Sequence, residues 1–305
     1  MILLPHGLLE ADGLEPTPRR QPIGNEHTER FPLRVLLLNL MPEKQVTERD
    51  IIRMLEGCPE TIELIPLKIA GQTYKTTPMS HMDAFYVDFD CIEDEQFDAL
   101  IVTGAPVEHL PYEDVRYWPQ LCHIFDWTET HVRRSLYICW AAQAALYHFY
   151  GIRKHSLPTK SFGVFNYQFQ ELGKGKETSA SLVLGVRQGR QKQIAMPTSR
   201  HTSISTTDVA KAGNLHIVAH NIEKGVGIVS NSDGSALFVT GHLEYAEGRL
   251  GDEYRRDLKK GLPIAIPQNY FVDESKQTDI AYSWKADGLH FYHTWIEKIK
   301  EYDYK

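Results

Sequence analysis

Apolar runs alternate with helix-like segments through the first half of the chain, and this alternation constrains the fold more than any other feature. The run "LRVLLLNLM" is almost wholly apolar and is bounded by two prolines, which is typical of a strand buried on both faces of a parallel sheet. Three further runs alternate in the same way with amphipathic segments, which predicts an α/β fold whose parallel sheet is flanked by helices. The predicted strands are residues 33–41, 62–70, 97–105 and 135–140, and the predicted helices are residues 46–56, 113–131 and 141–150.

The second half of the chain is richer in short strand candidates separated by Gly, Asn and Asp. They end at "TGHLEY", which precedes a long amphipathic helix, and a last helix covers about residues 287–302. We expect residues 1–30, which are polar and rich in proline, to form a loosely ordered arm, and residues 31–305 to form one catalytic domain. The strand candidates are residues 162–169, 181–186, 203–206, 216–219, 225–229 and 236–240.

Composition narrows the class of protein. The 305 residues are 42% hydrophobic, enough for a substantial core, and the formal net charge of −7 argues against nucleic acid as a partner. The apolar stretch at residues 1–9 is too short to span a membrane and lacks a basic flank, so we expect a cytoplasmic protein. Four cysteines without CxxC spacing indicate reduced thiols, and the 14 histidines form no HExxH pair, so we expect no metal and no cofactor.

Cys139 lies where the fourth predicted strand meets the following helix. A nucleophile held at such a turn needs small neighbours, which Ala141 and Ala142 supply. The helix N-terminus would lower the pKa of the thiol and stabilise an oxyanion. Taken alone, this stretch fits an ordinary buried cysteine equally well.

His242 and Glu244 follow another apolar strand candidate, two residues apart in "TGHLEY". A cysteine nucleophile needs a base, and the base needs an acceptor that fixes its tautomer. His242 fits the role of base and Glu244 that of its partner, although these residues could also be ordinary polar groups of a solvated loop. Together with Cys139 they favour a nucleophilic enzyme.

Six segments in the same order resemble the homoserine O-acyltransferase (MetA-type) family, whose fold is flavodoxin-like and similar to that of class I glutamine amidotransferases. The resemblance covers about residues 32–270. Its segments are "LNLMPEK", "VTGAPVEHLPYEDVRYW", "ICWAAQAALYHFYGI", "KSFGVF", "SRHT" and "GHLEY" with the later "EYRRDL".

The resemblance implies a ping-pong acyl transfer in a homodimer. Cys139 would take the acyl group from acyl-CoA as a thioester, and His242, oriented by Glu244, would deprotonate the hydroxyl of an amino acid. The family's pattern places an oxyanion site at Lys44 and Trp140 and acceptor binding at Lys160, Ser199 and Arg256. Taken alone, Lys160 and Arg256 would be ordinary surface charges and Ser199 a turn residue.

Glu108, in "GAPVEHL", bears on the acyl donor. In the family that this chain resembles, glutamate at this position accompanies acetyl-CoA and glycine accompanies succinyl-CoA. A carboxylate in the acyl pocket would repel the free carboxylate of a succinyl group and fill its space. We therefore expect acetyl-CoA as the donor, although without the resemblance Glu108 would be an ordinary loop acid.

The chain departs from the family's homoserine pattern at Val46, Thr198, Leu243 and residues 284–292. These positions spare the catalytic groups, and we expect them to lie around acceptor-side and peripheral elements. Serine and homoserine differ by one methylene, which a pocket separates by only about 1–3 kcal/mol. We therefore favour L-serine as the acceptor, with L-homoserine as the alternative. A glutamine amidotransferase-type hydrolase and a non-catalytic binding module are the competing classes.

Overall fold

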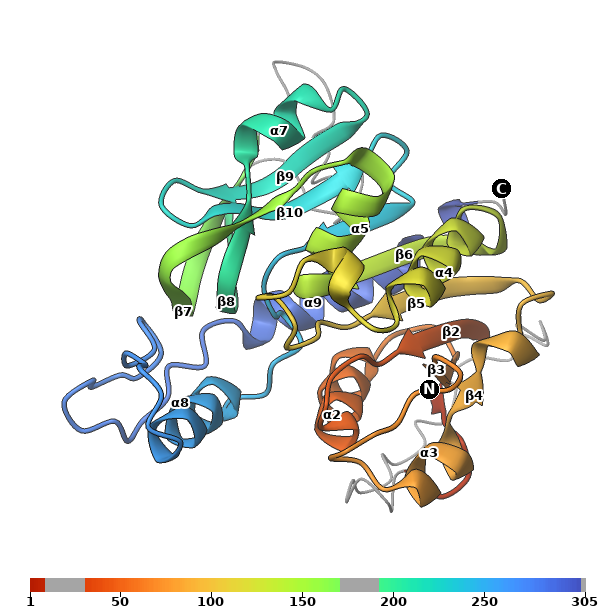
Figure 1. The fold of residues 1–305 in the computed structure, drawn as a ribbon, viewed down its shortest axis with the longest axis horizontal. Helices are drawn as coiled ribbons and strands as arrows, with labels where there is room; N and C mark the ends of the chain where they lie inside the picture. The colour runs from red at the N-terminus through yellow and green to blue at the C-terminus, as the bar shows by residue number, and fades with distance from the viewer. Residues whose placement is uncertain (9–30, 171–191, 303–305) are drawn as a thin grey trace.

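A single mixed sheet of 11 strands organises the part of the chain that the computed structural model describes, which is residues 1–8, 31–170 and 192–302 (Figure 1). The strand order is β1-β3-β2-β5-β6-β11-β10-β9-β7-β8, and β4 pairs with β3. The strands of the first half are β1 (Ile2–Leu3), β2 (Leu33–Leu38), β3 (Ile62–Lys68), β4 (Val87–Asp88), β5 (Phe97–Val102) and β6 (Val132–Ile138). Those of the second half are β7 (Lys154–Phe169), β8 (Gln193–Ile204), β9 (Leu215–Asn221), β10 (Gly225–Asn231) and β11 (Ala236–Val239).

The first half of the sheet is parallel, as the apolar runs predicted. The parallel pairs run from β1 through β3, β2, β5 and β6 to β11. After β2 the chain first goes to β3 on one side and later to β5 on the other. The carboxyl ends of β2 and β5 therefore flank a topological switch point, where open α/β sheets bind their ligands.

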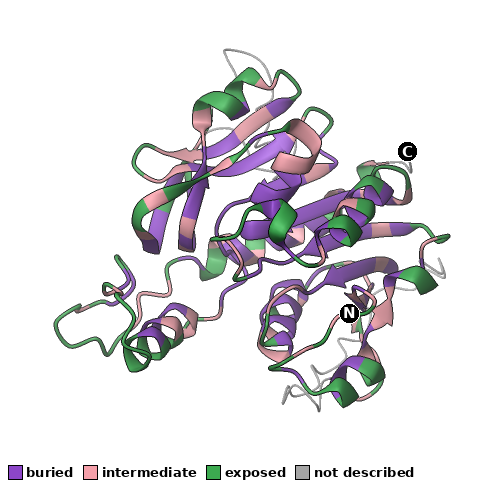
Figure 2. Cartoon of the chain, in the orientation of Figure 1, coloured by how far each residue is buried: buried purple, intermediate pink, exposed green. Residues whose placement is uncertain are grey.

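Helices cover both faces of this parallel region. Alternate residues of β2 point to opposite faces, because side chains of a strand alternate, and all but Arg34 are buried. Val35 and Leu37 share a core cluster with α2 (Lys44–Leu55) and α9 (Lys285–Glu297), whereas Leu36 and Leu38 share one with α4 (Trp118–His131) and α5 (Trp140–Tyr150). Figure 2 shows the buried strands between these half-exposed helices. The predicted helices are confirmed, with small shifts of their ends.

The second half of the sheet is antiparallel and differs more from the prediction. The segment expected at residues 162–169 is the end of a longer strand, β7, which pairs with β8 over most of its length. The strand expected at residues 203–206 is only the end of β8 and stops two residues earlier: Ile204 ends β8, and Ser205 caps the short helix α7 (Thr206–Lys211) by accepting a hydrogen bond from the Asp208 amide. The strand expected at residues 181–186 lies outside the described residues.

The N-terminal arm was also wrong for its first eight residues. Ile2 pairs with Ile62, the Met1 ammonium donates to the Glu60 carbonyl oxygen at 3.1 Å, and Leu8 is fully buried. An edge strand, β1, therefore extends the sheet beyond β3. Residues 9–30 of the predicted arm lie outside the described residues.

After β11 the chain leaves the sheet and forms α8 (Arg249–Lys259), which packs beside a loop of residues 260–284. Aromatic side chains join these parts to β7 in a third core cluster that includes Tyr245, Tyr270 and Trp284. Figure 1 shows α8 at one side of the molecule, away from the sheet. Within the described residues, every helix is too short or too polar to cross a membrane.

Candidate active site

Cys139 occupies a strained turn between β6 and α5. Its φ of 54° and ψ of −114° lie in a region that residues other than glycine seldom adopt. Its amide donates to the Val239 carbonyl oxygen at 2.7 Å, and its own carbonyl oxygen accepts from the Gln143 amide at 3.3 Å. Such strain persists only where the surroundings fix it, and it is typical of a nucleophile elbow.

Small residues make this turn possible. Ala141 and Ala142 are fully buried at the start of α5, as the sequence predicted. Gly104, which the sequence analysis did not single out, follows β5, and a Cβ placed on it would lie 3.2 Å from the Cys139 Cβ and 3.7 Å from the Trp140 amide nitrogen. The first amides of a helix lack partners within the helix. The Trp140 amide therefore lies beside the thiol, where an oxyanion would form.

His242 and Glu244 form a buried pair after β11. The His242 Nδ1 lies 2.6 Å from a Glu244 oxygen, and the ring stacks on Tyr245 with centroids 4.0 Å apart. The His242 amide donates to the Pro197 carbonyl oxygen at 2.8 Å. A Cβ on the preceding residue, Gly241, would lie only 2.6 Å from that same oxygen, so this turn needs glycine.

His242 lies near Cys139, and their charges interact. Burial lowers the pKa of His242, but the nearby Cys139 and Glu244 charges and hydrogen bonds to both side chains outweigh it, so the pKa is raised well above its ordinary value. Opposite charges nearby favour the protonated ring. His242, held by the Glu244 carboxylate, thus lies close enough to Cys139 for their charges to interact, an arrangement that can activate a thiol.

Lys44 lies at the start of α2 and is only 4% exposed. Its ammonium donates to the carbonyl oxygens of Asn39 and, at 3.0 Å, Met41, and its amide donates to the Thr77 hydroxyl at 3.3 Å. Burial lowers its pKa to about 8, partly offset by the charge of Glu48. The side chain braces the turn after β2, and an oxyanion role for Lys44 stays a prediction.

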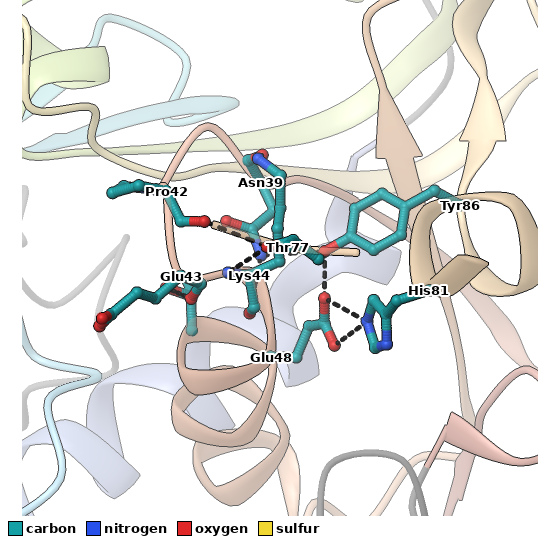
Figure 3. A network of polar contacts seen from close by, with 9 residues as sticks. Asn39, Pro42, Glu43, Lys44, Glu48, Thr77, His81 and Tyr86 are labelled. Carbon is teal, nitrogen blue, oxygen red and sulfur yellow. Dashed lines mark hydrogen bonds and ion pairs between the residues drawn. The ribbon is translucent and has the colours of Figure 1, made fainter. Parts of the chain in front are cut away.

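A buried polar network holds this turn in place (Figure 3). The Asn39 amide group donates to the Tyr86 hydroxyl at 3.0 Å and to the Lys44 carbonyl oxygen at 3.1 Å. Tyr86 in turn donates to Glu48, whose other oxygen lies 3.0 Å from His81 Nε2. The network ties the switch-point end of β2 to α3 (Met79–Phe85). Sequence reasoning missed it because its members are far apart in the chain.

The three residues expected to bind the acceptor are brought together by two acids of α8. Lys160 lies 3.6 Å from Glu253 and 3.5 Å from Asp257. The Ser199 hydroxyl donates to Glu253 at 2.6 Å, and Arg256 Nε donates to Asp257 at 2.8 Å. Glu253 and Asp257 were not predicted, although both lie in the quoted segment "EYRRDL".

Tyr245 joins this acceptor cluster to the base. Its hydroxyl donates to the second oxygen of Glu253 at 2.8 Å, while its ring stacks on His242. The acceptor cluster (Lys160, Ser199, Glu253, Arg256 and Asp257) is thus separated from the His242 imidazole by one aromatic ring.

Glu108 and His109 lie in the loop after β5 and meet His201 of β8, and the ligand atoms of these three residues lie within 4.8 Å of one another. Such a group could hold a metal ion, but the Lys154 charge acts on Glu108 and the Lys160 charge acts on His201. The positive charges of Lys154 and Lys160 disfavour a metal cation at this group, so we assign no metal to it. The position of Glu108 beside His201 makes it a neighbour of the acceptor side.

Two of the departures from the family pattern lie in the core and not in the acceptor-side or peripheral elements that the sequence predicted. Leu243 is buried in the cluster beneath α9, and its carbonyl oxygen is so close to α9 that a Cβ on Gly288 would lie 2.4 Å away. Thr198 is fully buried, with its hydroxyl 3.2 Å from that of Tyr167. These two substitutions change packing and therefore carry no argument about the acceptor.

Comparisons with known proteins agree with this architecture. A glutamine amidotransferase from Thermotoga maritima superposes with a TM-score of 0.55 at 12% identity, over 89% of this chain and 100% of that one. One from Methylobacillus flagellatus gives 0.56 at 12% identity, over 90% and 96%. These likenesses confirm the predicted fold.

Sequence relatives are closer. The homoserine O-acetyltransferase of Phocaeicola vulgatus is 43% identical over 265 residues, which is 87% of this chain and 84% of the relative. That of Brevibacillus brevis is 39% identical over 87% of this chain and 83% of its own. The family described as homoserine O-succinyltransferase matches residues 20–303. The chain is therefore an acyltransferase and belongs to the homoserine O-succinyltransferase family.

Proposed function

We propose that this enzyme transfers an acetyl group from acetyl-CoA to the hydroxyl of L-homoserine through a thioester on Cys139. The observation that carries the proposal is the strained turn that holds Cys139 near the buried His242–Glu244 pair. The names of the relatives support both the donor and the acceptor.

The first half-reaction forms the thioester. The Cys139 thiolate attacks the acetyl carbonyl carbon, and the oxyanion accepts a hydrogen bond from the Trp140 amide beside Gly104. The bond between the carbonyl carbon and the CoA sulfur then breaks. The His242 imidazolium, stabilised by Glu244, gives its proton to the leaving thiolate.

The second half-reaction uses the same groups in reverse. The neutral His242 ring takes the proton of the acceptor hydroxyl, and the oxygen attacks the acetyl carbon. The bond to the Cys139 sulfur breaks, which releases the ester and restores the thiolate–imidazolium pair. Because acetylation removes the thiolate charge that raises the pKa of His242, the thioester itself favours the neutral ring that this step needs.

The acceptor cluster suits an α-amino acid. Arg256 and Lys160 can bind an α-carboxylate, for which the guanidinium offers two parallel hydrogen bonds. Glu253 can accept from an α-ammonium group, and it is held by Ser199 and Tyr245. The ion pairs now made within the cluster would be exchanged for pairs with the two charges of the substrate.

The preference for L-serine that the sequence favoured is not supported. It depended on departures that were expected on the acceptor side, but Thr198 and Leu243 lie in the core. Relatives from 39% to 43% identity carry homoserine in their names. L-homoserine, the alternative, is therefore the acceptor that we propose.

The donor and the acceptor can be tested in one matrix of assays. We expect the kcat/KM for acetyl-CoA to exceed that for succinyl-CoA, and Glu108→Gly to narrow the gap, because it removes the carboxylate that repels the succinyl group. With acetyl-CoA, homoserine should be acetylated faster than serine. A preference for succinyl-CoA or serine would refute the corresponding half of the proposal, and glutamine hydrolysis without CoA would instead support the amidotransferase-type hydrolase.

We also propose, from the family resemblance, that the enzyme is a homodimer. Light scattering of the purified protein tests this, and a mass near 35.0 kDa, that of one chain, would contradict it.

A further inference from the structure

Two buried charged residues near the site occupy positions that local structure disfavours. Asp50 lies within α2 and is only 2% exposed. Arg249 is the first residue of α8, where the helix dipole disfavours a positive charge, and its side chain is only 13% exposed. Residues that break local rules are commonly kept for function.

These two residues pair with each other. Arg249 Nε lies 2.9 Å from one Asp50 oxygen, and Arg53 lies 3.4 Å from the other. Burial raises the pKa of Asp50 to about 7, against the opposing charge of Arg249, and the charge of Glu244 raises it further. A buried carboxylate close to a second buried carboxylate therefore depends on Arg249 for its charge.

The pair opens onto the catalytic groups. Asp50 and Arg249 line one small cleft with His242 and Glu244. The Arg249 guanidinium lies 5.2 Å from the ring centroid of Tyr245, the same ring that stacks on His242. Within the described residues, the second oxygen of Glu244 is buried and accepts no hydrogen bond, so charge rather than hydrogen bonding must support it on that side.

We propose that Arg249, anchored by Asp50, is a positioning residue for the catalytic pair: it stabilises the negative charge of Glu244 and fixes the plane of His242 through Tyr245. The inference rests on the proposed function, because it takes His242 as the base. It assigns a role in the reaction to a pair of residues that contact neither thiol nor acceptor.

The anchor matters because it balances charge. An ionised Asp50 cancels the charge of Arg249, so the pair supports Glu244 without adding a net positive charge beside His242. Removing the charge of Asp50 alone leaves the positive charge of Arg249, and removing Arg249 alone leaves the negative charge of Asp50. The two single substitutions should therefore shift the pH profile in opposite directions. The other charged or titratable groups that face the pair are Arg53 on α2, Glu244 and Tyr245 before α8, Glu253 on α8, Tyr282 before α9 and Tyr292 on α9.

The test is a charge-balanced cycle of Asp50→Asn, Arg249→Gln and the double variant. The readout is the pH profile of acetyl-enzyme formation, followed by intact mass after mixing with acetyl-CoA. In Asp50→Asn the uncompensated positive charge of Arg249 favours the Cys139 thiolate and disfavours the His242 imidazolium. The whole pH profile should therefore move to lower pH by about 0.5–1 unit. Arg249→Gln leaves a negative charge instead and should move the profile to higher pH. The double variant should return the profile to its original position yet stay slower at every pH, because Tyr245 and His242 are no longer held.

Arg249→Lys distinguishes the effect of the positive charge from the effect of the planar guanidinium group. It keeps the charge, so the profile should stay in place, but it loses the planar contact with Tyr245, so the rate should fall several-fold. The matched control is Arg255→Gln on the same helix, whose exposed side chain pairs with Asp252 at 2.7 Å. This control should alter neither rate nor profile.

Shifts of the two single variants in the same direction, or a double variant as fast as the parent protein, would overturn the proposal. If Arg249→Gln does not fold, the other two variants still test the proposal. Asp50→Asn must shift the pH profile, and Arg249→Lys must leave it in place. Failure of the proposed function itself looks different: the parent protein would form no acetyl-enzyme, or Cys139→Ala would still form one.

Discussion

The nucleophile and the acceptor cluster come from two regions that are built differently. Cys139 follows a strand of the parallel region whose neighbours on both sides are buried, and backbone hydrogen bonds fix its turn. The acceptor cluster joins β7 and β8 of the antiparallel region to α8, and ion pairs between side chains hold it together. Backbone hydrogen bonds thus fix the position of Cys139, whereas ion pairs between side chains hold the acceptor cluster together.

This difference separates the expected effects of substitutions. Changes near Cys139 should alter the formation of the thioester itself, because the turn has no freedom to adjust. Changes in the acceptor cluster should leave thioester formation intact and weaken only the second half-reaction. Transient kinetics that resolve the two half-reactions can therefore show whether substitutions in the two regions act on different half-reactions.

The largest effect is expected for Cys139→Ala, which should lower the transfer rate by about 10³-fold or more, as loss of a nucleophile does in comparable enzymes. The matched control is Cys58→Ala. Burial raises the pKa of Cys58 to about 12, so it stays an unreactive thiol. Intact mass should show one acetyl group in the Cys58 variant and none in the Cys139 variant; an acetyl group on the latter would place the nucleophile elsewhere.

The next effect concerns Gly104. Its replacement by alanine puts a Cβ 3.2 Å from the Cys139 Cβ, so the turn must shift by a few tenths of an ångström. We expect the rate of thioester formation to fall about 10–100-fold, because small displacements of a reacting group are costly. Gly213→Ala is the control, since its Cβ would meet no atom within 4 Å. Equal rates in the two variants would mean that the turn tolerates adjustment.

The parallel region was also the more predictable from sequence. Runs such as residues 33–41 are buried on both faces, so their apolar composition is continuous and their ends are marked by proline or glycine. The elbow at Cys139 followed from the same pattern. Gly104 was missed because its role depends on the close approach of two strand ends, which spacing in the chain does not encode.

The antiparallel region was predicted less well for a physical reason. Half-exposed strands such as β7 carry polar residues and a proline, so the segment at residues 154–161 resembles a loop. Glu253 and Asp257 looked like the ordinary acids of an exposed helix, because only the fold shows that they face Lys160. The pair of Asp50 and Arg249, about 200 residues apart, was invisible for the same reason.

Glu253→Gln should have a smaller effect that is confined to the acceptor. It removes the charge that we assign to the α-ammonium group, so the KM for homoserine should rise about tenfold, as expected for a lost charged hydrogen bond. Thioester formation should stay within twofold of the parent protein. Glu223→Gln, at an exposed position of the same half, is the control. A slower first half-reaction would show that the two regions are not separable.

The smallest expected change is a shift in pKa rather than a loss of activity. The nearby charge of Cys139 raises the pKa of His242, so Cys139→Ala should lower that pKa, while Cys58→Ala should leave it unchanged. Because a histidine is charged below its pKa, the imidazolium of the variant should lose its proton at lower pH. NMR titration of ring-labelled histidine, assigned with His242→Gln, measures this directly. An unchanged pKa would mean that Glu244 alone sets the protonation of the base, and that the thioester does not prepare His242 for the acceptor.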